Sequence, residues 1–326
     1  MPPEKITINS IVLLRAIAAL GVCFVHIQMG TDLKVNALID YIFMSGQQGV
    51  AVFFVISGFI LPYSLYKKHY QLNGFFNFLL KRSVRVDPPY WFCIILLFIL
   101  IPLPLSALSF KDILYHLTYA VPFINGAHWY NDIFWTLSIE FQFYILLGLL
   151  YPIFNKLPYY ITISLLIIVS VLCIKYTYRG IIISNVYQFV FGYIAFMAYT
   201  HIVDRKKFIV ILISFTIYIL FAKSIVSAMI PAFTVLFIML YKHNTKVPVM
   251  NFIGNISYSL YLVHFPVTVF IYRLLSAFTH SPIILFIACL LSSILFAYAF
   301  NIAIEKPALK LSKRISLHKS NPGDKQ

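Results

Sequence analysis

Residues 283–304 read IILFIACLLSSILFAYAFNIAI, a continuous stretch without a charged side chain. A helix needs about 20 mostly apolar residues to cross the hydrocarbon core of a bilayer, which is ~30 Å thick, at about 1.5 Å per residue. The stretch therefore predicts a transmembrane helix, and the lipid bilayer is the first expected partner of the chain.

Comparable apolar stretches recur along the whole chain. Because backbone polar groups in lipid must bond internally, long apolar stretches favour helices over a barrel, whose strands are short and alternating. The predicted fold is an all-α, polytopic transmembrane helical bundle of about ten helices. The predicted spans are 8–28, 49–65, 90–105, 135–154, 159–175, 181–200, 208–222, 224–241, 256–275 and 283–304. The second, third and seventh spans are short, and 208–241 could instead form a hairpin of tilted segments.

Composition and charge support the same class. The chain is 61% hydrophobic and 11% charged, whereas a soluble domain is about a quarter charged. Cytoplasmic loops of membrane proteins collect Lys and Arg, so the net charge of +15 is explained by topology, and we expect no nucleic-acid partner. Loops on the side of the N-terminus hold about three times as many basic residues as the opposite loops, which predicts cytoplasmic N- and C-termini.

We expect one membrane domain over 1–310 and a short basic cytoplasmic tail over 311–326. The first apolar stretch contains Arg15 and lacks a small-residue cleavage site at its end, so it predicts a retained helix instead of a cleaved signal. The four cysteines lie inside apolar stretches and have no metal-ligand spacing. They are expected to be buried apolar side chains, and no metal site is predicted.

Arg15 and His26 are ionisable residues inside the first predicted span. Their spacing of eleven residues turns a helix through about 1100°, within ~20° of three full turns, so both share one face and lie ~16 Å apart along the axis. Ionisable side chains inside spans usually face the interior of the bundle. We therefore expect this face to point inward, with His26 near the outer end of the helix.

Glu140 lies about two turns from the outer end of the predicted span 135–154. His26 and Glu140 are thus predicted to share the outer half of the membrane, where an imidazole and a carboxylate could act as an acid–base pair. The same two groups could equally form an interhelical hydrogen bond that only holds the bundle together.

Arg82 and Arg85 are predicted to lie at the inner end of the span 90–105. Clustering of basic residues on the cytoplasmic side explains their position without any further role. Two guanidinium groups at this spacing could also form bidentate contacts to phosphate, which would suit a nucleotide-bearing substrate on the cytoplasmic side.

Ser257, Tyr261 and His264 fall at positions i, i+4 and i+7 of the predicted span 256–275. This spacing predicts one polar stripe along the helix. Ser257, close to the predicted start, is expected to act partly as an N-cap. His264 is expected to bond a neighbouring backbone group.

The stretch from Gly49 to Phe59 combines small and aromatic residues in one span. Small residues at such positions predict close packing between helices. The alternative is a gap beside Ser57 and Gly58 through which a substrate chain passes.

These features follow one another as a series of six motifs. In chain order they are Arg15 with His26; Gly49 to Phe59; Arg82 and Arg85 before Pro88 and Tyr90; Trp135 to Glu140 with Phe143 and Tyr144; Ser257 to His264; and Glu305-Lys306-Pro307. The series resembles the acyltransferase-3 family of membrane acyltransferases from residue 8 to about residue 310. No single motif is diagnostic, but six in this order are highly specific. One small departure is Asp87, at a position where an aromatic residue is common in the family.

Members of that family typically transfer an acetyl group from acetyl-CoA to a hydroxyl of a carbohydrate destined for the cell surface. The resemblance implies that His26 is the catalytic histidine, with Glu140 as a second catalytic residue. It links Arg15, Arg82 and Arg85 to binding of the acyl-CoA or to the architecture of the site. Further site candidates, some of them possible donors to an oxyanion, are Ser57, Ser257, Tyr258, Tyr261, His264 and Glu305.

The resemblance also implies that acetyl-CoA is a co-substrate, that no cofactor is bound, and that the protein lies in a bacterial inner membrane. An acyl-histidine relay is the alternative to direct transfer of the acyl group. A transporter or flippase of sugars or lipid-linked glycans is the alternative function, although the motifs of the first half do not recur in the second as transporter repeats would. The acceptor carbohydrate, the acyl chain and the oligomeric state stay open.

Overall fold

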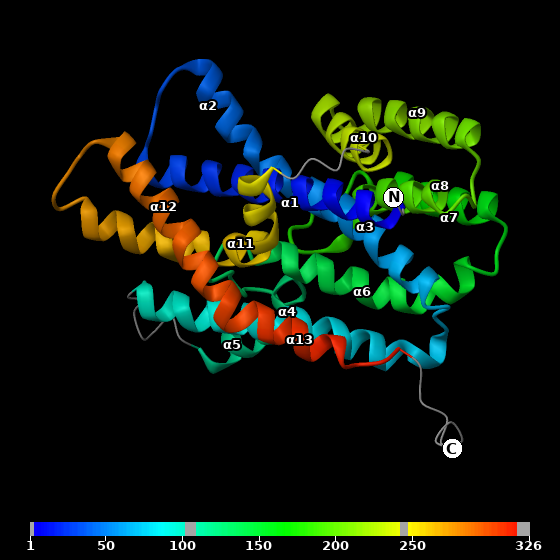
Figure 1. Ribbon diagram of the computed structural model, residues 1–326, viewed down its shortest axis with the longest axis horizontal. Helices are drawn as coiled ribbons and strands as arrows, with labels where there is room; N and C mark the ends of the chain where they lie inside the picture. Colours follow the sequence, from blue (N-terminus) through cyan, green and yellow to red (C-terminus); the bar gives the residue numbers. More distant parts are fainter. Residues whose placement is uncertain (1–2, 102–108, 242–246, 318–326) are drawn as a thin grey trace. The chain divides into compact units, whose positions relative to one another are not determined.

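The computed structural model describes residues 3–101, 109–241 and 247–317, with side chains from residue 9 onward. Every regular element within these ranges is a helix, and none is a strand (Figure 1). The predicted all-α class is therefore confirmed.

Seven helical segments of the described chain are long and apolar enough to cross a membrane, which makes this a multi-pass integral membrane protein. They are Asn9–Thr31, Ala37–Lys67, Leu72–Leu100, Trp135–Phe154, Ile182–Tyr199, Pro248–Leu275 and Pro282–Lys313. Two shorter apolar helices and one helix that begins with three basic residues fall on the remaining predicted spans. All ten predicted spans thus coincide with helices, although the last residues of the third, 102–105, lie outside the described residues.

The chain forms two compact units, each built from three separate segments. Unit 1 comprises Met1–Phe53, Asp87–Phe134 and Leu240–Pro307, and unit 2 comprises Phe54–Val86, Trp135–Met239 and Ala308–Gln326. The elements of unit 1 are α1 (Pro3–Thr31), α2 (Ala37–Met44), η1 (Ser45–Gln48), α5 (Phe110–Leu117), η4 (Val121–Phe123), α11 (Pro248–Leu275), α12 (Pro282–Phe300) and the π-helical turn η6 (Asn301–Glu305).

Unit 2 contains η2 (Leu72–Gly74), α6 (Trp135–Phe154), α7 (Tyr159–Cys173), η5 (Ile182–Asn185), α8 (Val186–Tyr199), α9 (Arg205–Ala222), α10 (Ile225–Leu240) and α13 (Lys306–Lys313). Two helices, α3 (Gly49–Lys67) and α4 (Phe75–Leu100), are divided between the units, and the last residue of α10 and the first two of α13 also fall in unit 1. The predicted tail 311–326 includes the end of α13, and its last part, 318–326, lies outside the described residues.

Several helix starts follow from local chemistry. The Asn36 side chain accepts a hydrogen bond from the Ile39 N–H at 2.9 Å and so caps α2. Asp204 does the same for α9 by accepting from the Lys207 N–H. Proline occupies the first turn of α11 and of α12, where its missing N–H has no intrahelical acceptor to lose.

The core of unit 1 is the packing of α1, α11 and α12 (Figure 1). Glycines let these backbones approach closely. A Cβ on Gly254 of α11 would overlap the carbonyl of Val12 in α1. A Cβ on Gly46 of η1 would overlap the carbonyl of Gly21 in α1. Close backbone approach through small residues is the usual way in which helices associate inside a membrane.

The helices α1 and α11 run in the same direction. Arg15 contacts Ser257 and His26 contacts His264, so the contacts follow the same order along both helices. In the ten-span map these helices are the first and the ninth, which must cross the membrane in the same sense. The packing inside unit 1 is therefore consistent with the predicted alternation of spans, while the side on which each terminus lies stays a prediction.

The core of unit 2 surrounds α8, which is buried from Tyr187 to Ala198. A Cβ on Gly58 of α3 would overlap the Phe189 carbonyl of α8, and a Cβ on Gly192 would overlap the α3 backbone. The backbone of α8 thus fills the space beside Gly58. Close packing explains this part of α3, and the predicted alternative of a substrate gap beside Gly58 is wrong.

Two helices begin well before the predicted positions. The helix predicted at 90–105 begins at Phe75, and the helix predicted at 256–275 begins at Pro248. Arg82 and Arg85 consequently lie within α4, and not beyond its end. The cause is that α4 continues through Pro88 and Pro89, which membrane helices tolerate because surrounding groups satisfy the backbone.

Candidate active site

The central feature of unit 1 is a pair of imidazoles. Nε2 of His264 lies 3.1 Å from Nδ1 of His26, and the two ring centroids are 5.1 Å apart. Nδ1 of His26 also lies 2.9 Å from the Val22 carbonyl, and Nδ1 of His264 lies 3.0 Å from the Leu260 carbonyl. The predicted backbone contact of His264 is confirmed, but sequence reasoning missed that its second nitrogen meets His26.

Arg15 lies on the same helix as His26 and contacts the same partner helix. Its Nε donates to the Ser257 hydroxyl at 3.1 Å, and that hydroxyl donates to the Gly254 carbonyl at 2.8 Å. The predicted inward face of α1 is therefore the face that packs on α11. The N-cap role predicted for Ser257 is wrong, because Ser257 lies in the interior of α11, where it serves as the acceptor for Arg15.

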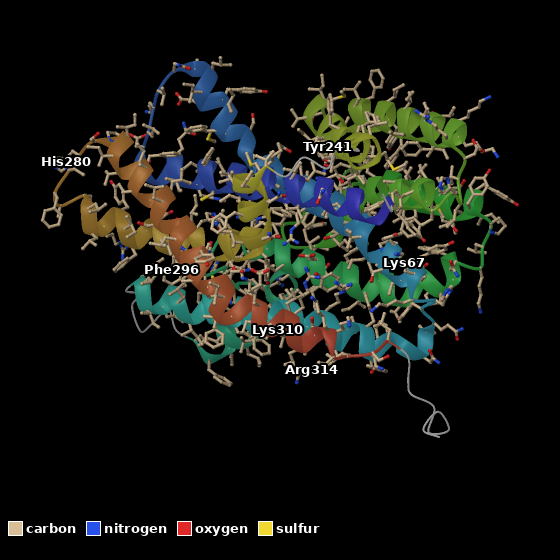
Figure 2. All side chains as sticks on the ribbon, in the orientation of Figure 1. Lys67, Tyr241, His280, Phe296, Lys310 and Arg314 are labelled. Atoms are coloured by element: carbon tan, nitrogen blue, oxygen red, sulfur yellow. The ribbon has the colours of Figure 1, made fainter. Side chains whose placement is uncertain are left out.

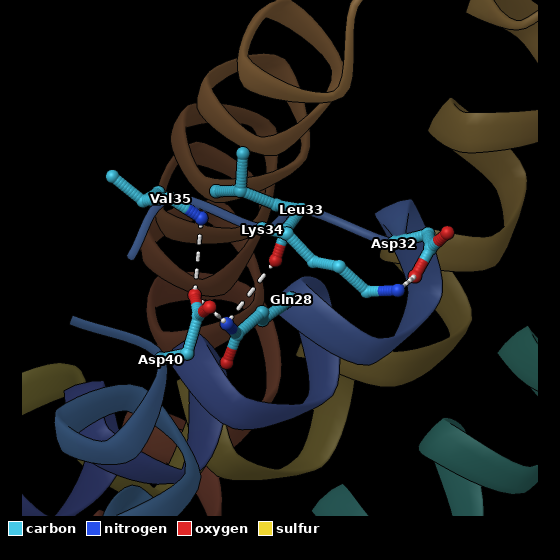
Figure 3. Close-up of polar contacts among 6 residues, drawn as sticks. All are labelled: Gln28, Asp32, Leu33, Lys34, Val35 and Asp40. Atoms are coloured by element: carbon cyan, nitrogen blue, oxygen red, sulfur yellow. Dashed lines mark hydrogen bonds and ion pairs between the residues drawn. The ribbon is translucent and has the colours of Figure 1, made fainter. Parts of the chain in front are cut away.

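A cluster of hydrogen bonds restrains the chain just beyond His26 (Figure 3). Nε2 of Gln28 donates to the Leu33 carbonyl at 3.1 Å and to Oδ1 of Asp40 at 2.9 Å. The same carboxylate oxygen accepts from the Val35 N–H at 3.2 Å. These bonds tie the end of α1 to α2 and so restrain the helix two residues after the imidazole.

Glu305 fastens the middle of α11 from the π-helical turn that follows α12. Its Oε2 accepts from the Ser259 hydroxyl at 2.6 Å, from the Ser259 N–H at 3.2 Å and from the Asn301 amide at 2.7 Å. π-Helical turns occur often at functional sites. Here the turn aims a carboxylate at the helix that carries Ser257 and His264.

Tyr261 and His264 are both engaged in hydrogen bonds within unit 1. The Tyr261 hydroxyl donates to the Ile133 carbonyl at 3.1 Å, and both His264 nitrogens have the partners described above. Stabilising an oxyanion would require each of them to give up such a bond. The oxyanion donor, for which the sequence offers Tyr258, Tyr261 and His264 without preference, stays a prediction.

In unit 2, Glu140 is held by two hydroxyl groups. The Ser57 hydroxyl donates to its Oε1 at 3.0 Å, and the Tyr144 hydroxyl, one helical turn further along α6, also bonds the carboxylate. Ser57 was predicted as a site residue, and the structure gives it a partner. Tyr144 was quoted only as part of a motif, although its i+4 spacing from Glu140 is a signal that could have found it.

Arg82 approaches the same cluster from α4. Its guanidinium lies over the rings of Phe78 and Tyr144, 5.6 and 6.0 Å from their centroids, and it interacts electrostatically with Glu140. Its Nε is buried and has no hydrogen-bond partner among the described residues. A buried guanidinium nitrogen without an acceptor marks a place where an anionic ligand oxygen could bind.

The family profile described as an acyltransferase domain matches residues 8–302. The chain belongs to the acyltransferase-3 family. It is also 28% identical over 173 residues to nodulation protein 10 of Rhizobium leguminosarum bv. viciae, an alignment that covers 45% of each chain. It is 29% identical over 171 residues to acyltransferase MdmB of Streptomyces mycarofaciens, covering 48% of this chain and 43% of that protein.

The aligned region therefore spans less than half the length of these curated relatives. No solved structure matches the chain. Membership of the acyltransferase-3 family favours the enzyme over the alternative of a transporter or flippase.

Asp87, the departure from the acyltransferase-3 pattern, has a defined setting in unit 1. It is buried, and its Oδ1 accepts from the Tyr119 hydroxyl at 2.8 Å. Burial and the neighbouring carboxylate raise the pKa of Tyr119 well above its ordinary value, so this phenol keeps its proton. Tyr119 also has a positive φ of 58°, and neither its conformation nor its partner was predicted from the sequence.

His116 in α5 is a second buried histidine that sequence reasoning missed. Its Nδ1 lies 2.7 Å from the Asp112 carbonyl, and its Nε2 accepts from the Tyr130 N–H at 3.1 Å. Its ring stacks on Tyr130 with centroids 4.2 Å apart. Burial lowers the pKa of His116, so the neutral imidazole holds the segment between α5 and α6.

The predicted site residues are thus divided between the two units. Unit 1 joins Arg15 to Ser257 and His26 to His264, whereas unit 2 joins Ser57 to Glu140 and brings Arg82 to the same cluster. The pairing of His26 with Glu140 stays a prediction.

Proposed function

We propose that this protein transfers an acyl group, acetyl from acetyl-CoA, to a hydroxyl of a cell-surface carbohydrate or its lipid-linked precursor. The proposal is carried by one observation, the His26 imidazole held in hydrogen-bond contact with a second helix. Membership of the acyltransferase-3 family supports the reaction class. The wider setting that we propose is a bacterial inner membrane.

His26 is the general base of the proposed reaction. A neutral imidazole can take the proton of a carbohydrate hydroxyl while its oxygen attacks the thioester carbonyl. The bond between carbon and sulfur then breaks, and the proton passes from His26 to the leaving sulfur. The hydroxyl becomes an ester and coenzyme A leaves as the thiol, so atoms and charge balance.

Arg82 and Arg85 are the proposed contacts of the acyl-CoA phosphates. The support is the buried Arg82 Nε, which has no acceptor among the described residues and belongs to a guanidinium that lies over two aromatic rings. Arginine is suited to this role because its planar group donates two parallel hydrogen bonds to phosphate. Arg15, fastened to Ser257, is the proposed contact for the donor on the helix that carries the base.

Glu140 is proposed to orient or stabilise the charged form of the base during transfer. Two hydroxyl donors, from Ser57 and Tyr144, fix the direction of its carboxylate. A carboxylate in fixed orientation can stabilise an imidazolium without reorganising during the reaction.

The test is acylation of surface carbohydrate in cells that carry the wild-type gene, no gene, or a variant. We expect mass spectrometry to show a carbohydrate that gains one acyl group with the wild-type gene and loses it with His26→Ala. His280→Ala is the matched control, because His280 is exposed in the loop between α11 and α12 (Figure 2). Acylation that persists in His26→Ala at equal protein level would refute the role of the base.

The donor site is tested separately by binding of acetyl-CoA to the purified protein in lipid nanodiscs. Arg82→Ala should weaken binding about tenfold or more, the loss expected for one charge-assisted contact of about 1.5–3 kcal/mol. Arg314→Ala removes an exposed cation just after α13 and should leave affinity unchanged (Figure 2). Equal weakening by both variants would indicate attraction by general charge, and no dedicated site.

A further inference from the structure

The imidazole pair of unit 1 fixes where the protons lie. A carbonyl oxygen can only accept, so Nδ1 of His264, 3.0 Å from the Leu260 carbonyl, must carry its proton. His264 is fully buried, where a second, charging proton is costly. Nε2 of His264 is therefore the acceptor nitrogen of a neutral ring.

The proton between the two rings must then come from His26. Nδ1 of His26 faces two acceptors, Nε2 of His264 at 3.1 Å and the Val22 carbonyl at 2.9 Å. A protonated Nδ1 can donate to both acceptors, whereas an unprotonated Nδ1 would place its own lone pair against the lone pairs of the two acceptors. In the neutral ring, Nε2 of His26 is thus the basic nitrogen.

We propose that His264 is a positioning residue of the acyl transfer, which directs the Nδ1 proton of His26 and makes Nε2 of His26 the nitrogen that takes the substrate proton. This inference rests on the proposed role of His26 as base. When Nε2 takes a proton, the Nδ1–H of the resulting imidazolium becomes a charge-assisted donor to His264. His264 thereby stabilises the charged base without being charged itself.

The segment of α11 that carries His264 is held on several sides within unit 1. Glu305 binds Ser259, the Ile133 carbonyl accepts from Tyr261, and Sγ of Cys93 donates to the Leu262 carbonyl at 3.1 Å. Among the described residues, the titratable rings beside His264 include His26 and Tyr261, at 5.1 and 6.1 Å between centroids. A positioning residue needs such a second layer of contacts, because its effect depends on a fixed distance to the base.

The first test reads the proton position without any turnover. The protein is labelled with ¹⁵N-histidine, placed in lipid bilayers and measured by solid-state NMR, and the His26 signals are assigned by their loss in His26→Gln. We expect a protonated Nδ1 and an unprotonated Nε2 for His26 in the neutral state. A protonated Nε2 with a bare Nδ1 would overturn the proposal.

The second test compares two replacements of His264 in the acetyl-transfer assay. His264→Gln places an amide oxygen near the position of Nε2 and keeps an acceptor, whereas His264→Leu removes it. We expect His264→Leu to lower kcat by about 10- to 100-fold, the value of one hydrogen bond to a charged group. KM for acetyl-CoA should not change, and His264→Gln should recover part of the loss.

The pH profile separates positioning from a merely structural role. Losing the acceptor destabilises the imidazolium, so the acidic limb of kcat/KM should move to lower pH in His264→Leu and stay near its original place in His264→Gln. His280→Gln is the control and should match the wild type. Equal loss of kcat in both His264 variants, with an unmoved acidic limb, would contradict the proposal.

The two hypotheses fail in different ways. Activity retained in His26→Ala would remove the role of the base, whatever the NMR spectrum shows. Wild-type kcat in a folded His264→Leu would remove the positioning role alone and leave His26 as the base. If His264→Leu does not fold, His264→Gln and the spectrum of the wild type decide the inference.

Discussion

Replacing Ser259 with alanine tests whether Glu305 holds the helix of the imidazole pair. The Ser259 hydroxyl makes the shortest of three hydrogen bonds to one carboxylate oxygen, at 2.6 Å, and the side chain is fully buried. A hydrogen bond to a charged group contributes about 1.5–3 kcal/mol. At about 2 °C per kcal/mol for a chain of this size, the apparent Tm should fall by about 3–6 °C.

The assay is thermal unfolding of the purified protein in detergent or nanodiscs, followed by size-exclusion chromatography. Glu305→Ala should cost more than Ser259→Ala, because it leaves the Ser259 N–H and the Asn301 amide without their shared acceptor. The double variant should be little worse than Glu305→Ala alone, because the residues act on one another.

Ser276→Ala is the matched control, since this half-exposed serine just past the end of the same helix makes only a weak contact at 3.4 Å. Its apparent Tm should change by less than about 1 °C. Fully additive losses in the Ser259 and Glu305 double variant would show that the two side chains do not interact, and the account of how α11 is held would be wrong.

Three further predictions concern other parts of the molecule. Gly58→Ala should destabilise the protein by about 1–3 kcal/mol, because the added methyl group meets the α8 backbone. Gly30→Ala is the control and should be tolerated, because its added methyl group would have ordinary contact distances. Equal Tm values for the two variants would contradict the packing of α3 on α8. Burial lowers the folded-state pKa of His116, so the unfolded chain binds more protons than the folded chain at mildly acidic pH. The contribution of the neutral His116 to stability is therefore full above about pH 6.5 and is lost as the pH falls below that value. Hydrogen exchange at the Tyr130 amide, corrected for its intrinsic rate, should therefore accelerate below about pH 6.5, and a flat profile would oppose this role. Cys173 is only half-buried while the other cysteines are buried, so a membrane-permeant maleimide should label it about tenfold faster or more, and comparable labelling of any other cysteine would disagree.

The helical class and the positions of the spans could be predicted because they depend on local properties. An apolar stretch of sufficient length must satisfy its backbone internally in lipid, whatever its neighbours are. The start of α4 could not be predicted in this way. The basic residues Arg82 and Arg85 and the two prolines suggest a boundary, yet the helix runs through all of them, and contacts with Phe78 and Tyr144 accommodate Arg82.

In the candidate site, too, some features follow from local sequence and others from tertiary packing. The sequence by itself determined that Arg15 and His26 share one helical face, because the helical repeat fixes the angle between residues eleven apart. Only the tertiary structure decided that this face meets Ser257 and His264, since such contacts depend on which helices pack together and at which height. The residues in each pair are more than two hundred positions apart, and no local property of the chain carries that information.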